Sequence, residues 1–79
     1  MQITGIVKRD GRTSMFDITK ISDAISKAFD ATYRAGSREL SESLASEVLS
    51  ILELEGDDLP DVEHIQDIVE KVLMDNGYI

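Results

Sequence analysis

The 79-residue chain has no cysteine, no tryptophan, one proline and a single histidine, His64. The absence of cysteine excludes disulfides, thiolate metal sites and thiol nucleophiles, and one histidine without cysteine argues against a transition-metal site. No apolar run approaches the roughly 20 residues that a membrane-spanning helix needs, and no signal sequence opens the chain. We therefore expect a cytoplasmic protein without a membrane partner and without a metal held by its own side chains.

Positive charge is also scarce. Eight Lys and Arg residues face sixteen Asp and Glu residues, which gives a net charge of -8. Nucleic-acid-binding proteins present broad basic surfaces, so nucleic acid is not an expected partner. Hydrophobic residues make up 42% of the chain and charged residues 30%, which is a globular composition. At this length we expect one small domain spanning residues 1–79.

The few cations are concentrated near the N-terminus. Four of the eight, Lys8, Arg9, Arg12 and Lys20, lie in the first 20 residues, which contain only two acidic residues. Taken alone, cations beside a turn are more often solvated side chains than ligands. A lysine in the first turn of a helix, however, opposes the helix dipole unless an anion offsets it. Together with free N–H groups at a helix start, these cations could form a compact anion site.

The sequence "IVKRDGRTSMF" indicates a β-hairpin at about residues 3–16. Asp10-Gly11 suits a type I′ turn, because both central residues of that turn need a positive φ. The flanking strands are expected at about 3–9 and 12–16, where apolar and β-branched residues roughly alternate. An isolated hairpin is only marginally stable. We therefore expect Met15 and Phe16 to anchor it to the rest of the molecule.

Three helices are expected, at about residues 18–34, 38–54 and 62–76. Each has an apolar stripe at i, i+3, i+4 and i+7 spacing. Asp17 or Thr19 can cap the first helix, and Asp61 can cap the third. Gly36 and Gly77 are suited to end the first and third helices. The fold class is thus mainly α with a small N-terminal β-hairpin laid on a helical bundle. The spacing of the Ser, His and acidic residues does not indicate a catalytic site, so we do not expect this domain to be an enzyme by itself.

Three motifs, "VKRDG" (7–11), "FDITKI" (16–21) and "VEHIQDIVEKVL" (62–73), resemble the ATP-cone domain. This nucleotide-sensing module occurs at the N-terminus of many ribonucleotide reductase large subunits. The anaerobic ribonucleoside-triphosphate reductases look closest. The resemblance implies a bundle of about four helices under a hairpin lid, and therefore a C-terminal helix truncated in this sequence. It also implies an allosteric site for ATP or dATP, with Mg²⁺ accompanying the triphosphate, and no chemistry in the domain itself.

The resemblance implies roles for individual residues. The hairpin and first-helix cations would contact phosphate, and further side chains would surround the base and sugar. The complete implied nucleotide site is Val7, Lys8, Arg9, Ser14, Phe16, Asp17, Lys20, Ile21, Val62, His64 and Gln66. Val7 and Ile21 would be apolar walls near the adenine, and Lys20 would be the leading phosphate ligand. Some relatives have a carboxylate where this sequence has Ser14, which implies a different contact to the adenine edge.

The resemblance also implies partners: adenine nucleotides, a downstream catalytic domain of the same chain, and self-association of the parent enzyme. Two alternatives stay open. ATP-cones also occur in a nucleotide-responsive transcriptional repressor, where a Cys-rich zinc ribbon precedes the cone. A small helical bundle could instead be a plain protein-interaction module, which would not respond to ATP.

Overall fold

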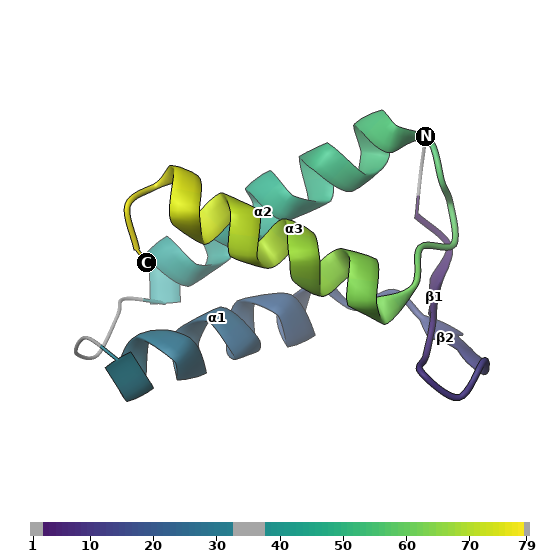
Figure 1. The fold of residues 1–79 in the computed structure, drawn as a ribbon, viewed down its shortest axis with the longest axis horizontal. Helices are drawn as coiled ribbons and strands as arrows, with labels where there is room; N and C mark the ends of the chain where they lie inside the picture. Colours follow the sequence, from purple (N-terminus) through teal and green to yellow (C-terminus); the bar gives the residue numbers. More distant parts are fainter. Residues whose placement is uncertain (1–2, 33–37, 79) are drawn as a thin grey trace.

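The computed structural model describes residues 3–32 and 38–78, which form a two-stranded sheet and three helices (Figure 1). The strands are β1 (Gly5–Val7) and β2 (Thr13–Met15), and the helices are α1 (Ile18–Thr32), α2 (Arg38–Glu55) and α3 (Val62–Asp75). The expected mainly α fold with an N-terminal hairpin is confirmed. The helix bounds lie close to the expected ones, but Gly36, expected to end the first helix, lies outside the described residues.

The strands pair antiparallel with Val7 opposite Thr13, and this register differs from the expected one. A two-residue loop centred on Asp10-Gly11 would place Val7 opposite Ser14. Gly11 has a φ of 88°, but no non-glycine residue in the described chain has a positive φ. The type I′ prediction is therefore wrong.

The observed turn is a three-residue loop. The Gly11 N–H donates to the Lys8 carbonyl (2.9 Å), and the Lys8 N–H donates to the Arg12 carbonyl (2.7 Å). In this pattern a left-handed glycine follows a turn centred on Arg9 and Asp10. The Asp10 carboxylate also accepts a hydrogen bond from the Arg12 N–H at 3.0 Å, which ties the loop internally. The sequence pair Asp-Gly fits both loops, because each needs a positive φ at the glycine.

The second edge of β1 is occupied by the segment between α2 and α3. The Thr4 N–H donates to the Asp58 carbonyl (2.9 Å), and the Val7 N–H donates to the Pro60 carbonyl (3.0 Å). A parallel bridge also joins Val7 to Asp61. These long-range bonds fasten the hairpin to the start of α3, so that α1 and α3 both begin at the hairpin end of the molecule (Figure 1).

The core forms where the apolar stripes of the helices meet α2, which packs against both α1 and α3. The buried apolar side chains are Ile3, Ile21, Ile25, Phe29, Leu44, Ala45, Val48, Leu52, Ile65, Ile68 and Val72. Phe16 packs against this cluster as expected. Met15 does not, because its side chain is 84% exposed.

The ends of α1 and α3 follow local sequence signals. Asp17 accepts from the Thr19 N–H at the start of α1 (3.0 Å), and Asp61 accepts from the His64 N–H at the start of α3 (2.8 Å). Gly77, with a φ of 83°, ends α3. There the Tyr78 N–H donates to the Leu73 carbonyl (2.9 Å), which is the bond of a Schellman motif. The expected caps at Asp17 and Asp61 are thus confirmed.

Candidate functional site: two adjoining hollows at the hairpin end

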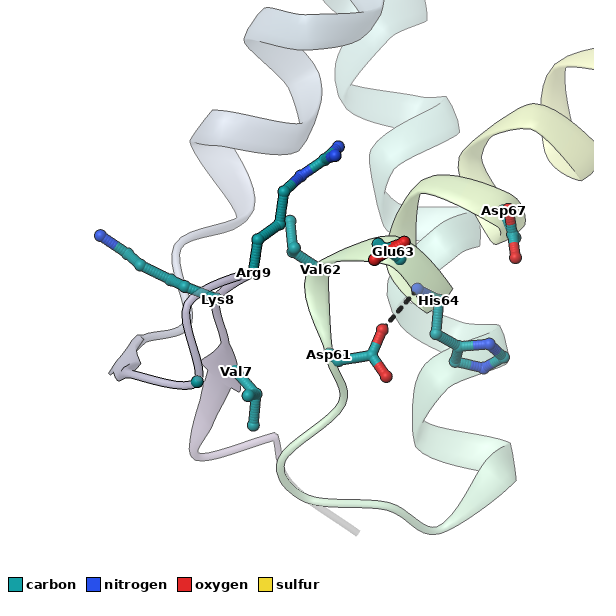
Figure 2. A pocket seen from close by; sticks show the side chains of 9 residues that line it. Val7, Lys8, Arg9, Asp61, Val62, Glu63, His64 and Asp67 are labelled. Atoms are coloured by element: carbon teal, nitrogen blue, oxygen red, sulfur yellow. Dashed lines mark hydrogen bonds between the residues drawn. The ribbon is translucent and has the colours of Figure 1, made fainter.

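The first hollow is a polar cleft between the hairpin turn and the start of α3 (Figure 2). Its volume is about 520 Å³. The lining residues are Val7, Lys8, Arg9, Gly11, Asp61, Val62, Glu63, His64 and Asp67. In Figure 2 the hairpin side supplies cations and the α3 side supplies carboxylates. The cleft therefore has mixed charge, and its α3 side is unfavourable for a phosphate.

The second hollow is an apolar groove that the hairpin, α1 and α3 enclose. Its volume is about 480 Å³. The lining residues are Ile6, Met15, Phe16, Asp17, Lys20, Ile21, Ala24, Ile25, Ala28, Val62, Ile65, Gln66, Val69, Glu70 and Leu73. Most of these side chains are apolar, and the polar ones are few. Val62 lines both hollows, so the cleft and the groove adjoin at the first residue of α3.

The implied nucleotide-site residues divide between the two hollows. Six of them line the groove: Phe16, Asp17, Lys20, Ile21, Val62 and Gln66. Val7, Lys8, Arg9 and His64 line the cleft. Ser14 lies within β2 opposite Ile6 and lines neither hollow. The hairpin and the start of α1 thus meet the start of α3 at one end of the molecule, although Ile21 and Val62 are 41 residues apart along the chain.

Asp17 is held at the mouth of the groove by its capping bonds. One carboxylate oxygen accepts from the Thr19 hydroxyl (2.6 Å) and from the Thr19 N–H (3.0 Å). These hydrogen bonds, with a smaller contribution from the charge of Lys20, lower the pKa of Asp17 below its usual value. Asp17 is therefore a carboxylate at neutral pH, and within residues 3–32 and 38–78 its other oxygen accepts no hydrogen bond.

The cations around the hollows are not neutralised by carboxylates. Arg12 pairs with Asp10 at 3.3 Å. Within residues 3–32 and 38–78, by contrast, Lys8, Arg9 and Lys20 form no ion pair. Three positive charges at the hairpin end are thus available to an external anion.

Arg9 has a neutral partner. Its Nη2 donates to the Gln66 Oε1 at 3.4 Å, across 57 residues of sequence. Figure 2 shows Arg9 reaching over Val62, whereas Lys8 points away from the α3 side chains. Arg9 lines the cleft and Gln66 lines the groove, so this hydrogen bond lies where the two hollows meet.

His64 is paired with Glu55, the last residue of α2. The His64 Nε2 donates to the Glu55 Oε1 at 2.7 Å, and both side chains are partly exposed. This hydrogen bond raises the pKa of His64 above its usual value. The His64 ring thereby links the end of α2 to the start of α3 at the edge of the cleft.

Sequence reasoning missed several residues that line the hollows. Glu70 lines the groove, and Glu63 and Asp67 line the cleft. Their i, i+4 and i+3 spacing on one side of α3 is the signal that could have identified them. In the described part of the chain, no group of three or more His, Asp or Glu side chains is arranged to hold a metal ion. No helix in residues 3–32 and 38–78 is long and apolar enough to cross a membrane.

Two known proteins to which the chain is similar are both ribonucleoside-diphosphate reductases. The chain is 40% identical over 83 residues to the ribonucleoside-diphosphate reductase subunit alpha of Chlamydia pneumoniae, covering 96% of this chain and 8% of that protein. It is 42% identical over 72 residues to the vitamin B12-dependent ribonucleoside-diphosphate reductase of Thermoplasma acidophilum, covering 91% of this chain and 9% of that protein. The chain thus spans less than a tenth of either relative. Neither comparison tests the narrower resemblance to anaerobic triphosphate reductases.

The family model for the ATP cone domain matches residues 4–79. This range contains the hairpin, all three described helices and both hollows. The chain belongs to the ATP-cone family.

Proposed function

We propose that the chain is the allosteric nucleotide-sensing domain of a ribonucleotide reductase. In this proposal the base of ATP or dATP lies in the apolar groove, and the phosphates lie among the hairpin-end cations. One observation carries the proposal: Lys8, Arg9 and Lys20 have no ion pair within the described residues, and they line two adjoining hollows. The family of the chain supports the same assignment.

The groove suits an adenine ring. A volume of about 480 Å³ is within the range of small-molecule sites, and such sites are mostly apolar with a few placed polar groups. Phe16, Ile21 and Val62 provide apolar surface for the faces of the ring. The Asp17 carboxylate can accept a hydrogen bond from the amino group on the adenine edge. Apolar walls and an acceptor at the mouth therefore match a flat ring with a polar edge.

The hairpin end suits a triphosphate. Lys20 lies in the first turn of α1, and the positive dipole ends of α1 and α3 both lie at this end. Each charge-assisted hydrogen bond to a phosphate contributes roughly 1.5–3 kcal/mol. Glu63 and Asp67 would repel phosphates deep in the cleft. Three carboxylates line the cleft and two, Asp17 and Glu70, line the groove, so we place the triphosphate on the groove side of Arg9, beside Lys20. Mg²⁺ would accompany it, held mainly by phosphate oxygens.

The proposed role is regulatory, and the domain performs no chemistry by itself. ATP and dATP differ by one hydroxyl, so they can act differently only through different affinities for two states of the parent enzyme. A coupling of about 1–3 kcal/mol is enough for such a shift. The partners in this proposal are the catalytic domain of the same chain and other copies of the parent enzyme in the cytoplasm. The repressor parent remains the alternative and would use the same nucleotide site.

Calorimetry and thermal unfolding of the chain with four ligands test this proposal. ATP and dATP should bind saturably, and ATP at a hundredfold excess over Kd should raise the free energy of unfolding by about 2.7 kcal/mol. Adenosine and inorganic triphosphate should each bind more weakly, because each fills only part of the site. Equal binding of inorganic triphosphate and ATP would contradict adenine recognition. The absence of any shift with ATP would favour a protein-interaction module.

A further inference from the structure

We infer that Gln66 is a positioning residue that holds the Arg9 guanidinium over the groove, ready for phosphate. The inference rests on the proposed nucleotide site and goes beyond a direct contact of Gln66 with the ligand. Its basis is the hydrogen bond from Arg9 Nη2 to Gln66 Oε1, at 3.4 Å. This bond fixes a side chain of the hairpin turn against α3 at the point where cleft and groove meet.

The hydrogen-bond partner of Arg9 is a neutral amide, and this determines whether Arg9 keeps its charge for a phosphate. Glu63 and Asp67 lie on either side of Gln66 in the sequence and line the cleft that Arg9 also lines. A bond from Arg9 to either carboxylate would neutralise the charge that a phosphate needs. The amide oxygen of Gln66 instead takes one of five guanidinium donors and leaves the positive charge in place. Arg9 is therefore oriented without being neutralised.

The expected effect is modest, because the bond is long and exposed. A long side chain loses conformational freedom when a ligand immobilises it, and a tether in the free protein removes part of that loss. Loss of the tether should therefore weaken ATP binding by about two- to tenfold. The effect should depend on phosphate. Adenosine has no phosphate to contact Arg9, so its affinity should not change.

The alternative is that the bond only fastens the hairpin to α3. Displacement of the hairpin would open the groove and weaken adenosine and ATP alike. The ratio of the two affinities therefore separates a positioning role from a purely structural one. Gln66 is exposed, so its substitution is not expected to prevent folding.

The experiment measures Kd for ATP and for adenosine in the wild type and in Gln66→Leu, Gln66→Glu, Arg9→Ala and the Arg9→Ala/Gln66→Leu double variant. Gln66→Leu should lose about two- to tenfold in ATP affinity only. Gln66→Glu should lose more, because a carboxylate neutralises Arg9. The double variant should match Arg9→Ala, because the tether has no function without the guanidinium. The melting curve of each variant, compared with that of the wild type, serves as the control for folding.

Unchanged ATP affinity in Gln66→Leu would overturn the inference, and so would equal losses for ATP and adenosine. An additive double variant would also overturn it. These outcomes leave the proposed nucleotide site intact, because the wild type still binds ATP. If the wild type bound no ATP at all, the proposed function would fail first and the inference with it.

Discussion

Replacement of Lys20 by alanine should have opposite effects on nucleotide binding and on the stability of the free protein. Lys20 lies in the first turn of α1 and lines the groove, and it has no ion pair within the described residues. A lysine at that position opposes the helix dipole. Its removal should therefore stabilise the free protein by a few tenths of a kcal/mol.

The loss in ATP affinity should be much larger. A charge-assisted hydrogen bond to phosphate contributes roughly 1.5–3 kcal/mol, which corresponds to about a 10- to 150-fold increase in Kd. Lys27 provides the matched control, because it is an exposed lysine on the same helix and lines neither hollow. It lies seven residues further along α1, or about 10 Å along the axis. That is about one Debye length at 0.1 M salt, so Lys27→Ala should change Kd by less than about threefold.

The assay is calorimetric titration of both variants with ATP at 0.1 M salt, together with urea unfolding of the free proteins. Equal losses of affinity in Lys20→Ala and Lys27→Ala would show that only the net charge matters. An unchanged Kd in Lys20→Ala would refute the placement of phosphate beside the groove.

Three further predictions concern stability. A Cβ on Gly5 would lie 2.7 Å from the Ser14 carbonyl oxygen, so Gly5→Ala should lower the free energy of unfolding by about 1–3 kcal/mol in urea; an unchanged value would contradict the strand register. Asp61→Ala should cost about 1 kcal/mol by loss of the α3 cap, and Asp61→Asn much less; equal losses would contradict the capping role. Because its partner Glu55 raises the pKa of His64, their contribution is complete below the usual histidine pKa of about 6.5 and is lost as pH rises through the raised value. The free energy of unfolding, measured in urea near pH 6 and near pH 8, should therefore decline more with pH in the wild type than in Glu55→Gln. Identical pH profiles in the two proteins would contradict this.

The features predicted correctly from the sequence depend on residues close together in the chain. The caps at Asp17 and Asp61 bond to groups two and three residues away. Gly77 ends α3 by bonds within one turn. The stripes on the helices place Ile25, Val48 and similar residues in the core, because 3.6-residue periodicity fixes which face is buried. Local chemistry was sufficient for these elements.

The features that sequence analysis missed depend on long-range pairing. Nothing in the residues around Thr4 indicates its bonds to Asp58, 54 residues away. The turn type followed from the strand register rather than from Asp10-Gly11 itself. The division of the implied site into a cleft and a groove likewise depends on how the hairpin attaches to α3.

The most direct test of the account is a set of intermolecular nuclear Overhauser effects in the ATP-saturated chain. The adenine H2 and H8 protons should give cross-peaks to the Ile21 and Val62 methyl groups and to the Phe16 ring, because the account places the base in the groove. Cross-peaks to Val7 and His64 without any to Ile21 or Phe16 would place the base in the polar cleft and contradict the account.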